Sequence, residues 1–257
     1  MSFALITGAS KGIGRAIAIQ FAKKGKNVLL VARNEELLQQ VSTEIETTYK
    51  VNAPYLPADL SMDESAGQII DWCKKNNYTV DVLVNNAGYG LSGAFEKHLL
   101  EEHMNMMRLN MNTVVRLTYL FLPFLKNQSK SYILNIASSA GYQATPFMGL
   151  YSASKSFVLL FSRALHHELK TTNVSVTCVS PGSTSTAFND RAQIGQKARD
   201  LAKRVEMSPD AVARIAIEAM YKGKPEVIIG ILNKIGVFLV WLLPKKMIER
   251  TAAKIYQ

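Results

Sequence analysis

The sequence predicts an α/β protein with one doubly wound parallel sheet of about seven strands and helices on both faces. Short apolar runs alternate with longer amphipathic runs along the chain, as in repeated β-α units. A glycine-rich turn follows the first apolar run, and right-handed crossovers then favour a Rossmann-type sheet. The 257 residues contain no linker, low-complexity tract or repeat, so residues 1–257 are expected to form a single domain.

The elements are predicted in order from the amino terminus. The apolar runs predict strands at residues 3–7, 28–32, 54–57, 80–85, 132–137, 174–179 and 226–229. The amphipathic runs predict helices near residues 13–24, 35–49, 63–76, 98–126, 151–170 and 209–222. Strands that are apolar throughout fit a parallel sheet, because helices cover both of its faces.

Composition narrows the class of partner and the compartment. The net charge is +10, but the basic residues are spread along the chain without a basic arm, so nucleic acid is not an expected partner. A negatively charged cofactor or acyl carrier explains the charge more economically. The only cysteines, Cys73 and Cys178, lack metal-like spacing, and no metal site is predicted. Without a disulfide framework or secretory signal, the expected location is cytoplasmic.

The glycine-rich turn covers residues 7–15 and joins the first predicted strand to the first predicted helix. Gly8, Gly12 and Gly14 permit a tight turn and let the backbone approach a pyrophosphate, which the positive end of the helix attracts. Their spacing, G-x-x-x-G-x-G, differs from the general G-x-G-x-x-G fingerprint. The position at the start of a β-α series predicts a dinucleotide site.

Tyr151 and Lys155 lie four residues apart in a predicted helix, so they share one face. An ammonium beside a phenol favours the phenolate and is expected to lower a pKa that is normally about 10. Such a tyrosine can donate and accept protons near neutral pH. Ser138 precedes Tyr151 by 13 residues, and its neighbour Ser139 is the alternative hydroxyl.

Two more motifs accompany the glycine-rich turn and the Ser138, Tyr151 and Lys155 group: Asn85-Asn86-Ala87-Gly88 after the fourth strand and Pro181-Gly182 after the sixth. Together these motifs resemble the short-chain dehydrogenase/reductase family over about residues 3–230. The resemblance implies that the catalytic residues are Asn110, Ser138, Tyr151 and Lys155. Tyr151 would transfer the substrate proton, Ser138 would polarise the carbonyl, and Lys155 would hold the nicotinamide ribose. Asn110 would position a water; the alternative is a buried amide that serves only backbone groups.

The same resemblance implies a set of cofactor-binding residues. They are Gly8, Ser10, Lys11, Gly12, Ile13, Gly14, Arg33, Asp59, Leu60, Asn86, Ala87, Gly88, Tyr151, Lys155, Pro181, Gly182, Thr184 and Thr186. Asp59 would contact adenine, and Asn86 would also steady the central sheet.

The end of the second predicted strand bears on the choice of cofactor. NAD-binding folds of this type place an acid there to hold the ribose 2′-hydroxyl. This chain has Ala32 followed by Arg33, and Lys11 lies in the glycine-rich turn. Two cations without a carboxylate suit a 2′-phosphate, which arginine can bind in a forked geometry. NADP(H) is therefore predicted in preference to NAD(H); the alternative is that both cations are solvated surface charges.

Residues 183–205 are predicted to form a mobile lid, because small, polar and charged residues follow the sixth strand there. The expected walls of the substrate pocket lie close to the matched motifs. They are Tyr89, Leu91, Tyr142, Gln143, Met148 and Phe188. Their apolar character predicts a lipophilic ketone or alcohol, and a steroid, a fatty acyl ketone and an aromatic ketone would all fit.

Residues 233–257 form an apolar and basic extension after the last predicted strand. The run at 235–243 is continuously apolar and lies between Lys234 and Lys245-Lys246. It is shorter than the roughly 20 residues that span a bilayer. It is expected to pack on a partner subunit or cover the substrate mouth, with peripheral membrane contact through 235–246 as the alternative. The resemblance also implies a homodimer or homotetramer.

These observations predict an NADP(H)-dependent oxidoreductase that interconverts a ketone and a secondary alcohol by hydride transfer. One alternative is a 3-oxoacyl-thioester reductase, because the positive charge would suit an acidic carrier protein. An alternative of another class is an NADPH-binding sensor or scaffold without turnover. The complete set of Asn, Ser, Tyr and Lys argues against the sensor, because binding alone does not require Tyr151 beside Lys155.

Overall fold

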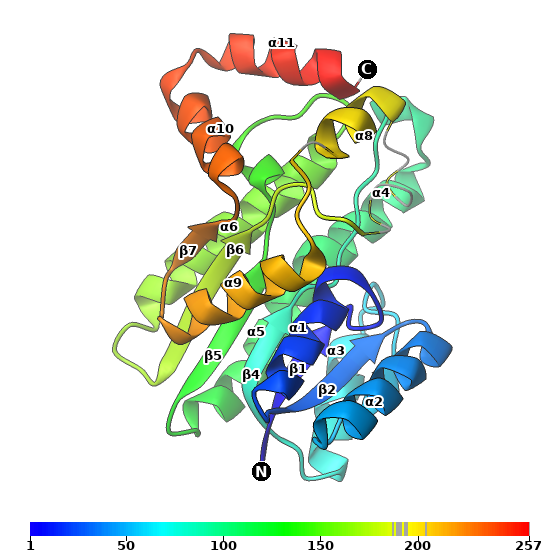
Figure 1. Cartoon of the computed structure of the whole chain (residues 1–257), viewed down its shortest axis with the longest axis vertical. Helices are drawn as coiled ribbons and strands as arrows, with labels where there is room; N and C mark the ends of the chain where they lie inside the picture. The colour runs from blue at the N-terminus through cyan, green and yellow to red at the C-terminus, as the bar shows by residue number, and fades with distance from the viewer. Residues whose placement is uncertain (187, 189–191, 193–194, 204, 257) are drawn as a thin grey trace.

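The computed structural model describes residues 1–186, 188, 192, 195–203 and 205–256, with a seven-stranded sheet among them (Figure 1). The strand order is β3-β2-β1-β4-β5-β6-β7, and all neighbours are parallel. The strands are β1 (Ser2–Thr7), β2 (Asn27–Ala32), β3 (Tyr55–Pro57), β4 (Thr79–Asn85), β5 (Ser131–Ile136), β6 (Val174–Ser180) and β7 (Glu226–Ile228). The predicted Rossmann-type fold is confirmed, and every strand boundary lies within one residue of its expected position.

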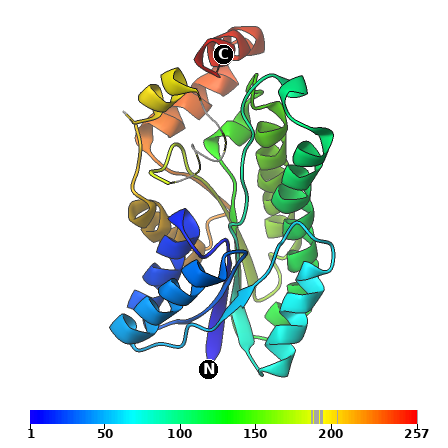
Figure 2. The ribbon, with the colours of Figure 1, turned by 90° about the vertical axis from the view of Figure 1, so that its right-hand side faces the viewer.

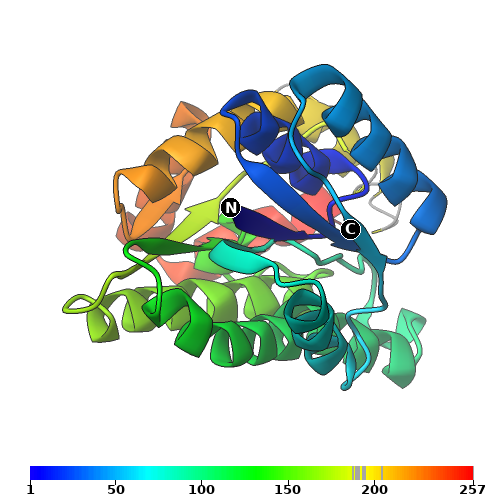
Figure 3. The same cartoon turned by 90° about the horizontal axis from the view of Figure 1, so that it is seen from below.

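Helices cover both faces of the sheet, as Figures 2 and 3 show from two directions. One layer contains α1 (Gly12–Lys23), α2 (Glu35–Tyr49) and α9 (Pro209–Tyr221), and the other contains α3 (Ser65–Lys75), α5 (Thr113–Lys126) and α6 (Gly149–Glu168). Alternate strand residues enter separate buried clusters, with Phe3 and Leu5 in one and Ala4 and Ile6 in the other. Because both faces are buried, the strands carry apolar residues on both sides.

The strand order reverses beside β1, and the chain therefore opens a crevice at the carboxyl ends of β1 and β4. Hydrogen bonds at Thr7 join these two ends. Its hydroxyl donates to Val84 O at 3.0 Å and accepts from Asn86 N at 2.9 Å. The Asn86 side-chain amide donates to Thr7 O at 2.9 Å. The expectation that Asn86 steadies the central sheet agrees with these contacts.

The helical segment predicted near residues 98–126 is confirmed, and it includes a π-helical turn that the sequence did not predict. It contains α4 (Leu100–Met107), a π-helical turn η2 (Arg108–Asn112) and then α5. Polar contacts to distant segments hold the turn: the Asn110 amide bonds the main chain of Tyr89, and the Thr113 hydroxyl donates to Leu60 O. Such π-helical turns are rare and are frequent at functional sites.

Two short 3₁₀-helical turns and three helices late in the chain complete the elements that the structure describes. These turns are η1 (Phe95–Lys97) and η3 (Ser139–Tyr142), and the late helices are α8 (Gln196–Lys203), α10 (Ile231–Leu242) and α11 (Lys245–Tyr256). Figure 1 places α10 and α11 at the end of the molecule opposite the amino terminus. The predicted lid at 183–205 includes α8, but residues 187, 189–191, 193–194 and 204 lie outside the described residues, as does residue 257 of the extension.

Candidate active site

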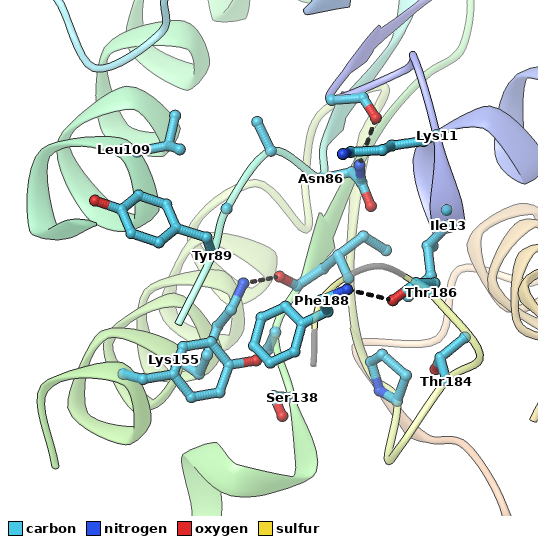
Figure 4. Close-up of a pocket in the computed structure, with 18 of the residues that line it drawn as sticks. Lys11, Ile13, Asn86, Tyr89, Leu109, Ser138, Lys155, Thr184, Thr186 and Phe188 are labelled. Carbon is cyan, nitrogen blue, oxygen red and sulfur yellow. Dashed lines mark hydrogen bonds between the residues drawn. The ribbon is translucent and has the colours of Figure 1, made fainter. Parts of the chain in front are cut away.

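A cavity of about 800 Å³ lies at the carboxyl ends of the strands, where the order of the sheet reverses. Most of the predicted site residues line it (Figure 4). They are Gly8, Ser10, Lys11, Gly12, Ile13, Arg33, Asp59, Leu60, Asn86, Ala87, Gly88, Tyr89, Ser138, Met148, Tyr151, Lys155, Pro181, Gly182, Thr184, Thr186 and Phe188. Gly14, Leu91, Asn110, Tyr142 and Gln143 are absent from the lining.

The glycine-rich turn forms one end of the cavity at the start of α1. Gly8 and Gly12 have φ values of +67° and +59°, which other residues adopt only at a cost. Gly14 lies beneath the turn: a Cβ there would be 2.3 Å from Gly8 O and 2.5 Å from Asn86 Nδ2. The first turn of α1 carries no acidic residue, so its positive end is free to attract a phosphate.

Two basic side chains lie at this end of the cavity. Lys11 precedes α1, and Arg33 follows β2, with Ala32 at the position where an acid would otherwise stand. The Arg33 guanidinium is 3.9 Å from the Asp59 carboxylate, and Asp59 also accepts hydrogen bonds from the main chain and hydroxyl of Ser61. Both Arg33 and Asp59 remain partly exposed to solvent, so each can still contact a ligand.

Tyr151 and Lys155 lie on the cavity face of α6, and both are buried. Ser138 lies beside the Tyr151 hydroxyl, and Ser138 Oγ accepts from Ala140 N at 3.1 Å. Lys155 Nζ is 5.9 Å from the Tyr151 ring centroid and donates to Ile136 O at 2.9 Å. Figure 4 shows Ser138 and Lys155 on the same side of the cavity, opposite Lys11.

The expected lowering of the Tyr151 pKa by Lys155 is wrong. Burial raises the pKa of Tyr151 to about 12; the Ser138 hydrogen bond acts in the opposite direction, and Tyr256 adds to the rise. Burial also lowers the pKa of Lys155 to about 8. The low-polarity surroundings disfavour the charged form of each group.

Asn110 lies behind the catalytic group in the π-helical turn and is almost fully buried. Its Oδ1 accepts from Tyr89 N at 3.1 Å, and its Nδ2 donates to Tyr89 O at 2.9 Å and to Ser154 Oγ at 3.0 Å. These bonds connect the loop after β4 to α6 beside Lys155. Two of the three bonds join the Asn110 amide to the main chain of Tyr89, as the alternative of a buried amide that serves backbone groups would require. The third joins it to the Ser154 hydroxyl.

Three of the six expected pocket walls line the cavity. The Phe188 ring is 5.3 Å from the Tyr151 ring, and Met148 is buried beside them. Tyr89 contributes its apolar body, because its hydroxyl donates to Glu102 O at 3.2 Å and to Asn105 Oδ1 at 3.0 Å. Figure 4 shows this hydroxyl pointing toward α4, away from Lys155.

The other three expected walls, Leu91, Tyr142 and Gln143, do not line the cavity. The Tyr142 hydroxyl instead contacts Glu226 and Ser180, at the β6–β7 edge of the sheet. Proximity in sequence to Ser138 was a poor guide here, because the chain turns through η3 and carries residue 142 away from the cavity.

The family model for short chain dehydrogenases matches residues 2–197. The chain belongs to this family. The short-chain dehydrogenase fold therefore places this protein among oxidoreductases that act on CH–OH or C=O groups. Among the residues described, the structure contains no group of three or more His, Cys, Asp or Glu side chains that could hold a metal ion.

Individual relatives have related names. Human (Homo sapiens) 17-beta-hydroxysteroid dehydrogenase type 3 is 36% identical over 189 residues, which cover 72% of this chain and 60% of that protein. Very-long-chain 3-oxoacyl-CoA reductase of Anas platyrhynchos is 38% identical over 188 residues, covering 70% and 59%. A short-chain dehydrogenase from Sphingobium yanoikuyae, solved with NADPH, has a TM-score of 0.82 at 26% identity, covering 95% of this chain and 97% of that one.

Sequence reasoning missed several lining residues of this short-chain dehydrogenase. Tyr256, near the end of α11, lines the cavity and contributes to the raised pKa of Tyr151. Leu109 and Ala198 line it from the π-helical turn and from α8. None of the residues of the apolar run at 235–243 lines the cavity. No motif marks Tyr256, which reaches the site only through the path of the last two helices.

Proposed function

We propose that this short-chain dehydrogenase uses NADP(H) to interconvert an apolar ketone and a secondary alcohol. One observation carries the proposal: Tyr151, Ser138 and Lys155 lie together in a cavity whose other end is the glycine-rich turn. That arrangement would place a proton donor and a carbonyl-orienting hydroxyl at one end and a phosphate cradle at the other.

Tyr151 would supply the proton. With a pKa of about 12 its hydroxyl is protonated at neutral pH, so it can donate to the oxygen of a bound ketone. The Ser138 hydroxyl would hydrogen-bond the same oxygen and hold the carbonyl in line with the phenol. A bound nicotinamide supplies the hydride in this chemistry.

Lys155 would hold the ribose of the cofactor. Its ammonium already donates to Ile136 O, which fixes the side chain, and its other N–H groups would bind ribose hydroxyls. Gly8, Gly12 and the positive end of α1 would receive the pyrophosphate. Asn110 would act as a positioning residue, because its amide joins the Tyr89 loop to α6.

The preference for NADP(H) rests on Arg33 and Lys11. Both line the end of the cavity beside α1, and Ala32 leaves no carboxylate to bind a ribose 2′-hydroxyl. A 2′-phosphate would gain charge-assisted hydrogen bonds from these cations. The NADPH bound to the Sphingobium yanoikuyae relative supports the same choice.

The substrate is proposed to be lipophilic, because apolar side chains and aromatic rings line the cavity that holds the catalytic group: Met148, Phe188, Leu109, Tyr89 and Tyr256. The human hydroxysteroid dehydrogenase relative supports a bulky alicyclic ketone. A second candidate is a 3-oxoacyl thioester, which the 38% identity to a very-long-chain 3-oxoacyl-CoA reductase favours. The alignments cover about three fifths of each of these relatives. An activity panel that contains both substrate classes should decide between a steroid ketone and a 3-oxoacyl thioester.

Self-association is also proposed, through the helical layer formed by α5 and α6. Exposed apolar side chains remain there, with Val115 and Tyr119 on α5 and Phe157 and Leu160 on α6. Exposed apolar patches of this kind mark interaction surfaces. Light scattering of the purified protein should give a mass above that of one chain, and Leu160→Glu should lower it; a monomeric native protein would contradict the proposal.

The proposed reaction is tested by substituting the proton donor. A panel of steroid ketones, aromatic ketones and 3-oxoacyl thioesters is screened by the loss of NADPH absorbance. Tyr151→Phe should reduce kcat on any substrate found by at least 1,000-fold, the order of general acid and orientation effects combined. NADPH binding, followed by fluorescence, should change little. Turnover that survives the substitution would refute the assigned role, and absence of turnover in the native protein on every substrate would favour the sensor alternative.

A further inference from the structure

The helix α10 presents an apolar face to solvent. None of its residues is buried, although its sequence is almost entirely apolar. Exposed side chains recur at the spacing of a single helical face, at Ile231, Ile235, Phe238, Leu239 and Leu242. Trp241 lies at the edge of this face and is 80% exposed. A contiguous patch of this kind marks a contact surface.

Basic side chains surround this apolar face. Lys234 lies within α10, and Lys245 and Lys246 begin α11. On α11 exposed cations recur every four residues, at Lys246, Arg250 and Lys254, so they form a row along one side of the helix. The opposite side of α11 packs inward through Ala252, Ile255 and Tyr256. Residues 231–256 contain five basic residues and one acidic residue, Glu249.

A second copy of the chain fits this surface poorly. A two-fold interface brings the same patch of both subunits together, so the cations around α10 would face one another. The helical layer of α5 and α6 already offers another apolar surface for self-association. An anionic lipid surface complements both features, because it accepts apolar side chains and attracts the cations around them.

We infer that α10 and α11 form a docking surface for membranes that contain anionic phospholipid. No helix among the described residues is long and apolar enough to cross a membrane. The 12-residue α10 would therefore lie parallel to the surface, with Phe238 and Trp241 in the interface and the α11 cations at the headgroups.

The docking surface is linked to the active site through both ends of the helix pair. At the start of α10, Asn233 lies against the loop after β6: a Cβ at Gly182 would be 2.2 Å from Asn233 Nδ2. At the end of α11, Tyr256 lines the cavity near Tyr151. Docking would therefore bring the cavity close to lipid, from which an apolar ketone could enter. This consequence rests on the proposed function, whereas docking does not.

The test is flotation of the full-length protein with vesicles of phosphatidylcholine alone or mixed with phosphatidylserine. We expect binding to the mixed vesicles and at least tenfold weaker binding to the neutral ones. Trp241→Glu should weaken binding at least tenfold, while Leu100→Glu, which alters a 73% exposed apolar side chain on α4, should leave it unchanged.

Charge is tested separately from the apolar face. Replacing Lys246 and Arg250 with Gln should weaken binding to mixed vesicles roughly 25-fold, from about fivefold per cation. Replacing the exposed Lys222 and Lys224 with Gln changes the net charge equally and should have little effect. Circular dichroism checks that each variant is folded.

Two outcomes would overturn the inference: native protein that fails to float with mixed vesicles, or Trp241→Glu that floats as well as native. If native protein fails to float and Trp241→Glu lowers its mass in light scattering, the occupant of α10 is a second copy instead. Flotation requires no turnover, so a failure of docking and a failure of the proposed reaction are distinguishable.

Discussion

Replacing Gly14 with alanine should destabilise the protein, although alanine normally favours a helix. Gly14 is the third residue of α1, and Gly67 is the third residue of α3, so the two glycines are matched in helical position. A Cβ at Gly14 would be 2.3 Å from Gly8 O, whereas a Cβ at Gly67 would have no neighbour within 4 Å. The same substitution should therefore have opposite effects at the two sites.

The magnitudes follow from these contacts. Alanine in place of helical glycine gains roughly 0.5–1 kcal/mol. At Gly14 the clash is with a backbone carbonyl, which cannot rotate away as a side chain can, and overpacking of this kind costs about 1–3 kcal/mol. We expect Gly67→Ala to raise the free energy of unfolding by roughly 0.5–1 kcal/mol and Gly14→Ala to lower it by about 1–2 kcal/mol. The melting temperatures should then differ by roughly 4–10 °C.

Urea unfolding followed by circular dichroism measures both changes. NADPH affinity, measured by fluorescence, should fall about tenfold in Gly14→Ala because the displaced Gly8 carbonyl distorts the glycine-rich turn. It should be unchanged in Gly67→Ala. Equal stability of the two variants, or Gly14→Ala more stable than native, would refute the reasoning from the close approach of α1 to β1.

Three further predictions concern the active site. Arg33→Ala should lower kcat/KM with NADPH about tenfold and leave kcat/KM with NADH unchanged. Arg214→Ala is the control, because Arg214 on α9 has similar exposure and also forms an ion pair; it should change kcat/KM with neither cofactor. Ketone reduction should decline as pH rises through about 8, because Lys155 loses its proton there while Tyr151 keeps its own to about 12; an upward slope would contradict this. Tyr256→Ala should raise KM for an apolar ketone about tenfold with little change in kcat, and an unchanged KM would exclude contact with substrate.

Most of the sheet and its helices could be predicted because they follow from local burial patterns. The helix expected at residues 35–49 has the same bounds as α2, and Asn34 caps it by accepting from Leu37 N at 2.8 Å. Strands buried on both faces leave short apolar runs, and their boundaries could be located within one residue. The glycine-rich turn and the Tyr151–Lys155 spacing were equally visible, since each depends on residues close together in sequence.

Contacts between distant segments decided the rest. Asn110 bonds the Tyr89 main chain from a π-helical turn within the predicted helix, and periodicity did not predict that turn. The pKa values of Tyr151 and Lys155 depend on how much of the protein surrounds them, which four-residue spacing does not reveal. Tyr256 enters the cavity because α11 folds back toward it. The sequence shows which residues are apolar and which can form a turn. It does not show what surrounds each group, because burial and close approach depend on how the whole chain packs.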